Sequence, residues 1–296
     1  MNVAIIGASG FLGKNLTKYL LENTDHEITA ISLDPESISI EDKYKNRVKN
    51  IKANVLDEEE IKEALSGIDV AYYFVHMMTN YKNNFHDKET LAAETTGQAL
   101  KSNGVRRVIY MSGLGNDNED LSRHLASRHN TGDILKKYLH EVIEFRASMI
   151  IGEGSASFEI VRNIIDKAPI ITLPRWSKTK TQPIGINDAL LYLKEACEIK
   201  INGPEIVEIG GLEKMSYLEF VKKYRDYHHK KNIIIRIPFL SEEVAGKSLP
   251  ILMNKNYSMV GQNMLSSFKN KMIVTNNRAK ELFPDISPKN IEESFI

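Results

Sequence analysis

The chain lacks the features that several large classes of function require. Its 296 residues include one cysteine, Cys197, which excludes an internal disulfide framework and fits a reducing compartment. The 39 basic and 39 acidic residues cancel, so no charge excess indicates nucleic acid or an anionic membrane surface as a partner. No apolar run reaches the about 18 residues that a transmembrane helix needs. We therefore expect a cytoplasmic protein that is not inserted in a membrane.

A glycine-rich turn near the start of the chain is the most informative motif. The apolar residues 3–6 lead into Gly7, and glycines recur at Gly10 and Gly13 before an amphipathic stretch. Gly7 permits a tight turn, Gly10 lets the backbone approach a pyrophosphate, and Gly13 lets the helix pack close to its strand. The helix N-terminus would offer free N–H groups to the phosphates. The motif predicts NAD or NADP bound at Gly7, Ser9, Gly10, Phe11, Leu12 and Gly13, the alternative being a glycine turn of another α/β fold.

Strand and helix patterns alternate through the first half of the chain. Short apolar runs predict strands, and longer amphipathic stretches between them predict helices. This βαβ alternation predicts a Rossmann-type, doubly wound parallel sheet with helices on both faces. The expected strands are 3–6, 27–32, 48–51, 70–75, 108–111 and 142–146, and the expected helices are 11–21, 58–65, 85–102 and 120–138.

The pattern changes after residue 150, where the elements become less regular. We expect a dinucleotide domain over 1–150, completed by 186–210, and a small C-terminal α+β substrate or interaction lobe over 151–185 and 211–296. Within the second half, the expected strands are 206–209 and 233–237, and the expected helices are 217–227 and a stretch at 242–268 containing Met253, Met259 and Met264.

Several short motifs occur in the order found in one known family. They are GASGFLG at 7–13, Asn54-Val55, Phe74-Val75-His76, MSGLG at 111–115, EFRASMIIG at 144–152, Pro174-Arg175-Trp176 and TQPIGIND at 181–188. Together they resemble the extended, atypical short-chain dehydrogenases/reductases, the NmrA-like and NAD(P)H-binding, epimerase-like group. The resemblance covers nearly the whole chain. It implies a Rossmann fold, a bound dinucleotide and a C-terminal substrate lobe.

The residue that reads the adenosine ribose is expected where the second strand ends. An acid there suits NAD and a base suits NADP. The strand ends in Leu33-Asp34, and Asp34 would repel a 2′-phosphate but accept a hydrogen bond from a 2′-hydroxyl. This favours NAD, unless Asp34-Pro35 merely opens a turn. Lysines at positions 14, 43 and 45 keep NADP open.

The resemblance also assigns contacts further along the cofactor. Asn54 would accept a hydrogen bond from the adenine amino group, where the family usually has aspartate, and Val55 would offer its backbone. The alternative for Asn54 is an exposed turn residue. Phe74 and Val75 would line the nicotinamide ribose. His76 would stand at the mouth of the crevice as a further candidate catalytic residue, unless it donates to a backbone carbonyl.

The catalytic residues of the family are only partly present. The resemblance implies a serine, a tyrosine and a lysine four residues after the tyrosine. Ser112 fits the serine, whereas His129 and Asp133 stand where the tyrosine and lysine belong. His129 is either an acid/base whose imidazole is held by Asp133 one turn on, or half of an ordinary surface helix pair. In the second case the protein binds cofactor without turning it over.

The remaining candidates concern the substrate. We place Arg146 and Trp176 in the substrate pocket, although Trp176 alternatively packs the two lobes together. No cluster of histidines and acids has metal-ligand spacing, so we predict no metal. The expected function is an oxidoreductase or epimerase-like enzyme on a small carbonyl or hydroxyl substrate. The alternative is a non-catalytic NAD(P)-sensing regulatory or scaffold protein with a protein partner, and a homodimer remains open in either case.

Overall fold

We analysed a computed structural model of the chain, which describes residues 1–77, 85–237, 261–262 and 265–295. Most of the helix expected over 242–268, including Met253, Met259 and Met264, lies outside the described residues. No helix formed by the described part of the chain is both long enough and apolar enough to cross a membrane.

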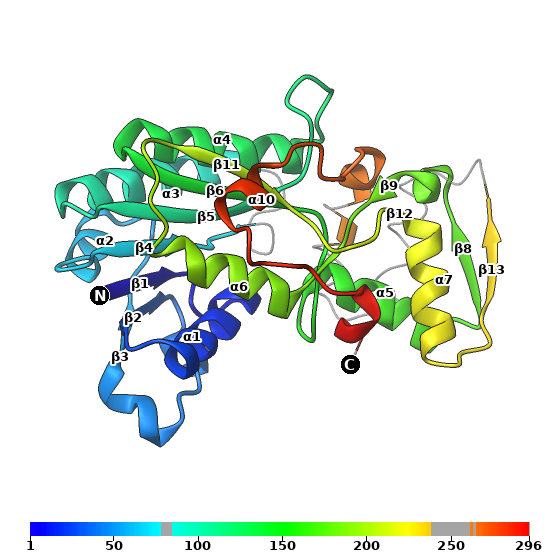
Figure 1. Ribbon diagram of the computed structural model, residues 1–296, viewed down its shortest axis with the longest axis horizontal. Coiled ribbons are helices and arrows are strands. Elements are labelled where there is room, and N and C mark those ends of the chain that lie inside the picture. Colours follow the sequence, from blue (N-terminus) through cyan, green and yellow to red (C-terminus); the bar gives the residue numbers. More distant parts are fainter. Residues whose placement is uncertain (78–84, 238–260, 263–264, 296) are drawn as a thin grey trace.

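A seven-stranded parallel sheet forms the centre of the larger part of the molecule (Figure 1). Its strand order is β11-β6-β5-β4-β1-β2-β3, so the order reverses between β1 and β4. Chain segments after these two strands therefore diverge and leave a crevice at the carboxyl edge. The strands are β1 (Asn2–Ile6), β2 (Glu27–Ser32), β3 (Val48–Lys52), β4 (Val70–Tyr73), β5 (Arg107–Gly113), β6 (Glu141–Ala147) and β11 (Glu205–Ile209).

Helices cover both faces of the sheet, as Figure 1 shows. The central strands β1 and β4 are apolar on both sides because both faces are buried there, and residues 3–6 are fully inaccessible. The doubly wound fold predicted from the sequence is therefore confirmed. One face carries α1 (Phe11–Asn23) and α6 (Ile186–Ala196), and the other carries α2 (Glu58–Ala64), α3 (Phe85–Ser102) and α4 (Arg123–Tyr138).

Side-chain caps define where several of these helices begin. Asp57 accepts a hydrogen bond from the Glu60 N–H at the start of α2, and Ser122 accepts one from Leu125 at the start of α4. Such caps satisfy amides that have no partner within the helix. The cap at Ser122 fixes the first turn of α4, which lies beside the candidate site.

The second lobe packs around its own core of aromatic and aliphatic residues. Phe158, Phe220 and Phe295 are almost wholly buried there. The lobe contains α5 (Ala156–Lys167), α7 (Tyr217–Tyr227), and the short strands β7 (Ile150–Ile151), β8 (Ile170–Leu173), β9 (Lys180–Thr181), β10 (Ile184–Gly185), β12 (Met215–Ser216) and β13 (Ile233–Arg236). The remaining pieces are α10 (Arg278–Leu282) and the 3-10 turns η1 (Pro35–Ser37), η2 (Asp42–Arg47), η3 (Arg175–Lys178), η4 (Leu265–Lys269) and η5 (Ile291–Ser294).

The structure shortens one expected strand at a functionally important point. The sequence pattern predicts a strand over 70–75, whereas β4 ends at Tyr73. The neighbouring β1 ends at Ile6, so the hydrogen bond from the Phe74 N–H to the Ile6 carbonyl is the last between them. Residues 74–77 then leave the sheet, and His76 lies on this departing segment.

Candidate functional site

The glycine turn has the shape that a dinucleotide diphosphate requires. Gly7 has φ +90°, and a Cβ there would lie 3.0 Å from the Phe74 carbonyl carbon. A Cβ on Gly13 would lie 2.6 Å from the Ala8 Cα, so the first turn of α1 packs directly on the glycine turn. Both positions leave room only for glycine, and they form a backbone cradle at the crevice between β1 and β4.

The N-terminus of α1 is open toward this cradle. Gly10 is the N-cap residue and supplies no side-chain cap, and the first turn contains no acidic residue. Amides at a helix start without a side-chain cap are suited to bind phosphate oxygens. The turn therefore fits the diphosphate of NAD or NADP.

The end of β2 offers hydrogen-bonding groups to a ribose. Asp34 occupies the cap position of η1, but its carboxylate forms no capping hydrogen bond there. The Ser32 hydroxyl is buried and has no partner among the described residues. Lys43 and Lys45 form ion pairs with Glu41 and Asp42, at 3.0 and 2.6 Å. Two of the three lysines that kept NADP open thus form ion pairs with acids of their own loop.

Asn54 lies in a turn and is bonded within it, which was the alternative to the expected adenine contact. Its Oδ1 accepts a hydrogen bond from the Leu56 N–H at 3.1 Å, and its own N–H donates to Glu60 at 2.8 Å. Val55 is buried in the core between the sheet and α2. A second lone pair on Asn54 Oδ1 leaves the expected adenine contact sterically and chemically open.

Ser112 lies at the carboxyl end of β5, where the structure isolates its hydroxyl. The side chain is 4% exposed, and its Oγ has no hydrogen-bond partner among the described residues. Helix α4 holds the two flanking peptides, because Arg128 donates to the Met111 carbonyl and His129 contacts the Gly113 carbonyl. Buried hydroxyls normally have a partner, and without one the Ser112 hydroxyl can donate a hydrogen bond at this edge.

His129 is hydrogen-bonded at both ring nitrogens, and Asp133 is not involved. Its Nδ1 lies 2.5 Å from Asp117 Oδ1 and its Nε2 lies 2.8 Å from the Gly113 carbonyl oxygen. Both partners are oxygen atoms that accept hydrogen bonds, and they hold the ring in place from two sides. The predicted His129–Asp133 pair is wrong, because His129 points inward to β5 while Asp133 lies largely in solvent and pairs with Lys136 at 3.2 Å.

Arg146 belongs to the same ionic network as His129. Its guanidinium contacts Glu144 and Asp117, both at 2.8 Å. Glu144 is fully buried and also accepts a hydrogen bond from Lys136 at 2.7 Å. We call this alternating series the charge chain: Asp133, Lys136, Glu144, Arg146, Asp117 and His129. Its contacts engage the Arg146 guanidinium within the protein, and the expectation that Arg146 contacts substrate stays a prediction.

A second histidine cluster lies at the carboxyl end of β4. His76 Nδ1 is hydrogen-bonded to Glu89 of α3, and His76 Nε2 lies 3.2 Å from His124 Nε2 of α4. The alternative in which His76 donates to a backbone carbonyl is therefore wrong. Glu89 also accepts hydrogen bonds from the Ser127 hydroxyl and from the Met77 N–H. His124 Nδ1 lies 3.1 Å from the Ser267 hydroxyl of η4.

The electrostatics of this cluster follow from its burial. Burial lowers the pKa of His76, against the opposing effect of Glu89. Burial and the nearby His76 and Arg128 hold the pKa of His124 well below its usual range. Burial alone would raise the pKa of Glu89, but hydrogen bonds from His76 and Ser127 lower it to about 2. At neutral pH the cluster thus contains a carboxylate and two neutral imidazoles.

Sequence reasoning missed Glu89, although a pattern indicated it. Glu89 lies three and four residues before Ala92 and Ala93, on the buried stripe of α3 that also includes Thr96. A carboxylate on the buried face of an amphipathic helix needs a partner. The sequence does not show which partner, because His76 and Ser127 come from other elements.

Trp176 packs within the second lobe. Its ring lies 5.0 Å from that of Phe268 and 6.0 Å from that of Tyr217, measured between centroids. These contacts join η3, η4 and α7 within one lobe, so they differ from the alternative in which Trp176 packs the two lobes together. Its expected contact with substrate stays a prediction.

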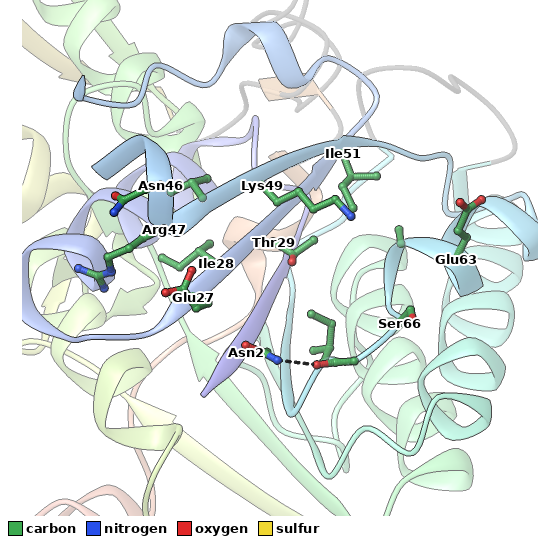
Figure 2. Close-up of a pocket in the computed structure, with 14 residues that line it drawn as sticks. Asn2, Glu27, Ile28, Thr29, Asn46, Arg47, Lys49, Ile51, Glu63 and Ser66 are labelled. Carbon is green, nitrogen blue, oxygen red and sulfur yellow. Dashed lines mark hydrogen bonds between the residues drawn. The ribbon is translucent and has the colours of Figure 1, made fainter. Parts of the chain in front are cut away.

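Two cavities lie away from the glycine turn. Figure 2 shows one of about 340 Å³ beside Asn2, Glu27 and Val48, the first residues of β1, β2 and β3. It opens at the amino edge of the sheet, opposite the end where ligands bind in such folds. The other, of about 380 Å³, lies between the end of β11 and residues 274–288. Within the described ranges no group of three histidines, cysteines or acids is arranged to hold a metal.

The comparison with protein families agrees with this geometry. Residues 7–162, more than half of the chain, match the NAD(P)H-binding family, and the chain belongs to that family. The predicted family and cofactor class are thus confirmed.

Two curated proteins resemble part of the sequence. The auxiliary protein GraX of Staphylococcus aureus is 30% identical over 125 residues, which cover 41% of this chain and 39% of GraX. Cinnamoyl-CoA reductase 1 of Petunia hybrida is 26% identical over 117 residues, covering 38% of this chain and 35% of the reductase. The chain thus spans about two fifths or less of the curated relatives it matches.

Solved structures match the fold over the whole chain. A nucleoside-diphosphate-sugar epimerase from Staphylococcus aureus has a TM-score of 0.76 at 15% identity, covering 100% of this chain and 99% of that one. Triphenylmethane reductase of Citrobacter sp. complexed with NADP(H) has a TM-score of 0.75 at 13% identity, covering 100% and 99%. UDP-glucuronic acid 4-epimerase from Bacillus cereus, with UDP-glucuronic acid and NAD, has 0.74 at 16%, covering 100% and 96%.

Proposed function

We propose that this protein is an NAD(H)-dependent oxidoreductase acting on a small carbonyl or hydroxyl substrate. The buried, unpartnered hydroxyl of Ser112 is the observation that supports this most directly. It lies at the carboxyl edge of the sheet, next to the crevice that the glycine turn borders. A hydroxyl that is shielded from solvent at that edge is suited to donate a hydrogen bond to a substrate oxygen.

Each part of the chain then has a defined task. The glycine turn and the start of α1 bind the diphosphate, and Asp34 accepts a hydrogen bond from the 2′-hydroxyl of an adenosine ribose. A bound dihydronicotinamide supplies a hydride for the carbonyl carbon. Ser112 orients the carbonyl, while Arg128 and His129 fix the peptides on either side of it.

Preference for NAD over NADP follows from charge. Asp34 would repel a 2′-phosphate, and Leu33 beside it offers no positive charge. Lys43 and Lys45 are drawn toward acids of their own loop. These contacts support NADH as the tighter ligand.

Fluorescence titration of the purified protein with NADH and with NADPH tests this function. We expect tighter binding of NADH, and weaker NADH binding by Asp34→Ala. Ser112→Ala should bind NADH normally but reduce aldehydes and ketones at least tenfold more slowly, because it removes a donor to the developing oxyanion. Ser102→Ala, which changes an exposed serine, is the control. Tighter NADPH binding would refute the argument from Asp34, and absence of turnover would refute the oxidoreductase.

A non-catalytic NAD(H)-sensing protein is the second candidate, and one observation supports it. The positions of the family tyrosine and lysine hold His129, whose two nitrogens are both engaged, and Asp133, which points to solvent. The partial likeness to an auxiliary protein is consistent with such a role. A sensor would bind NADH in the same titration without reducing any carbonyl compound.

A further inference from the structure

A continuous series of hydrogen bonds joins the C-terminal segment to the carboxyl end of β4. The Ser122 and Ser267 hydroxyls are 2.8 Å apart, and Ser267 lies 3.1 Å from His124 Nδ1. The Nε2 atoms of His124 and His76 are 3.2 Å apart, and His76 Nδ1 is bonded to Glu89. We call these five side chains the histidine relay.

The relay ends beside the proposed reaction site. His76 follows Phe74, whose backbone lies against Gly7 of the glycine turn. His124 is on α4, and Arg128 one turn later bonds the Met111 carbonyl next to Ser112. His76 thus comes from the segment that passes the glycine turn, and His124 comes from the helix that bonds the peptide before Ser112.

In the neutral relay, each side chain donates its hydrogen bond to the neighbour that lies nearer to Glu89. Glu89 is an acceptor, because its carboxylate takes hydrogen bonds from His76, Ser127 and the Met77 N–H. A neutral His76 that donates from Nδ1 must accept at Nε2. His124 then donates from Nε2 and accepts at Nδ1, where the Ser267 hydroxyl donates. Each donor points toward Glu89.

One added proton reverses that direction without moving the side chains. A doubly protonated His76 donates to His124 Nε2, and His124 then donates from Nδ1 to Ser267. The negative charge of Glu89 favours this loaded state, while Arg128 and His129 on α4 oppose it. A hydrogen-bonded series with two such states conducts a proton, and its outer end is the partly exposed Ser122.

We propose that His76 and His124 are the acid–base pair of this site, in place of the tyrosine and lysine that the chain lacks. The proposal rests on the oxidoreductase function above. Hydride arrival at a carbonyl carbon leaves the former π pair on oxygen. In the loaded state, that oxygen forms an O–H bond as the Nε2–H bond of the doubly protonated His76 breaks, which leaves two neutral imidazoles, and the relay then takes up a new proton from water at Ser122. Glu89 and Ser267 are positioning residues.

Histidine NMR of the cofactor-free protein tests the relay without any need for turnover. In protein labelled with nitrogen-15 at its eight histidines, ring spectra recorded between about pH 8 and about pH 5 report tautomer and charge. We expect His76→Asn to change the titration of His124, and His124→Asn to change that of His76. Ser267→Ala should change the His124 tautomer, and Ser267→Thr, which keeps a hydroxyl, should restore it. His140→Asn, at an exposed position, is the control and should change neither ring.

Kinetics test whether the pair delivers the proton. His124→Asn should lower kcat for carbonyl reduction on the order of 10²-fold, with NADH affinity retained, because general acid catalysis contributes that much or more. Glu89→Gln removes the charge that raises the pKa of His76. The alkaline limb of its pH–rate profile for carbonyl reduction, where the general acid has lost its proton, should therefore move to lower pH. Ser267→Ala should lose less activity than His124→Asn. Ser267→Thr, which keeps a hydroxyl, should have the activity that Ser267→Ala loses.

The outcomes separate this inference from the proposed function. Rings that titrate independently, or an active protein whose pH–rate profile is unchanged in His124→Asn and Glu89→Gln, would overturn the acid–base pair and leave the oxidoreductase intact. A protein that binds NADH but reduces no carbonyl compound would overturn both. If the titrations of His76 and His124 depend on each other and the kinetic losses are found, both the acid–base pair and the oxidoreductase function are supported.

Discussion

Two histidines of α4 have different surroundings, and the difference shows what makes an imidazole available for proton transfer. His129 lies between a carboxylate and a carbonyl, both fixed acceptors. His124 lies between a hydroxyl and a second imidazole, each of which both donates and accepts. The partners of His129 can only accept hydrogen bonds, whereas each partner of His124 can take either role, as transfer of a proton along the series requires. We therefore assign His129 to structure and His124 to chemistry.

The largest predicted effect comes from breaking the charge chain that holds His129. Glu144→Ala leaves Arg146 and Lys136 without their buried partner, and removing one member of a buried ion pair costs about 3–5 kcal/mol. Urea unfolding would measure the loss in the free energy of unfolding. Glu153→Ala, at an exposed position, is the control and should change it by less than about 0.5 kcal/mol. Equal stability of the two variants would show that the charge chain is not structural.

A smaller loss is expected from filling the space beside Glu144. A Cβ on Gly132 would lie 2.7 Å from the Glu144 carboxyl carbon, so Gly132→Ala must displace the carboxylate or the helix. Overpacking of this kind costs about 1–3 kcal/mol, despite the better helix propensity of alanine. Thermal unfolding is the measurement, with Lys137→Ala on the exposed side of α4 as control. A stabilised Gly132→Ala protein would contradict the close packing described.

The relay predicts a pH dependence of stability that begins near neutral pH. Because burial keeps the pKa of His76 and His124 below the ordinary value of 6.5, the unfolded chain takes up protons first as pH falls. Their contribution is full above about pH 6.5 and is lost as pH falls through the folded pKa values. Glu89, with a pKa of about 2 against an ordinary 4.5, adds a separate loss only below pH 4.5.

Denaturant unfolding at a series of pH values measures this dependence. His26 also has a pKa lowered by burial and acts in the same direction, so the wild type alone does not isolate the relay. The difference in the free energy of unfolding between wild type and His124→Asn isolates the relay, because both proteins contain His26. This difference should shrink as the pH falls below 6.5. A difference that stays constant over that range would contradict the lowered pKa of His124.

The smallest effect is expected at Asp133, the residue that sequence spacing paired with His129. Its side chain is 66% exposed and contacts only the Lys136 ammonium among charged groups of the described chain. Exposed ion pairs contribute about 0–1 kcal/mol. Asp133→Asn should therefore change stability by less than about 0.5 kcal/mol and leave NADH binding unchanged. Asp117→Asn, which removes the carboxylate that His129 does contact, should cost more in the same unfolding assay.

The amino-acid sequence by itself determined the fold and the cofactor class. The glycine turn at Gly7, Gly10 and Gly13 and the alternation of apolar strands with amphipathic helices are local patterns, and they are set by residues a few positions apart. The family match and the parallel sheet confirm both. Ser112 could also be placed at the end of its strand from the chain alone, because apolar residues mark that strand.

Only the tertiary structure decided which histidine has a partner that can exchange a proton. His76 contacts residues 13 and 48 positions away, and His124 contacts Ser267, which is 143 positions away. Spacing on α4 favoured Asp133 for His129, but the inward turn of the imidazole brought it to Asp117. Contacts of this kind depend on how helices rotate and pack against the sheet, and no local pattern in the sequence specifies that rotation.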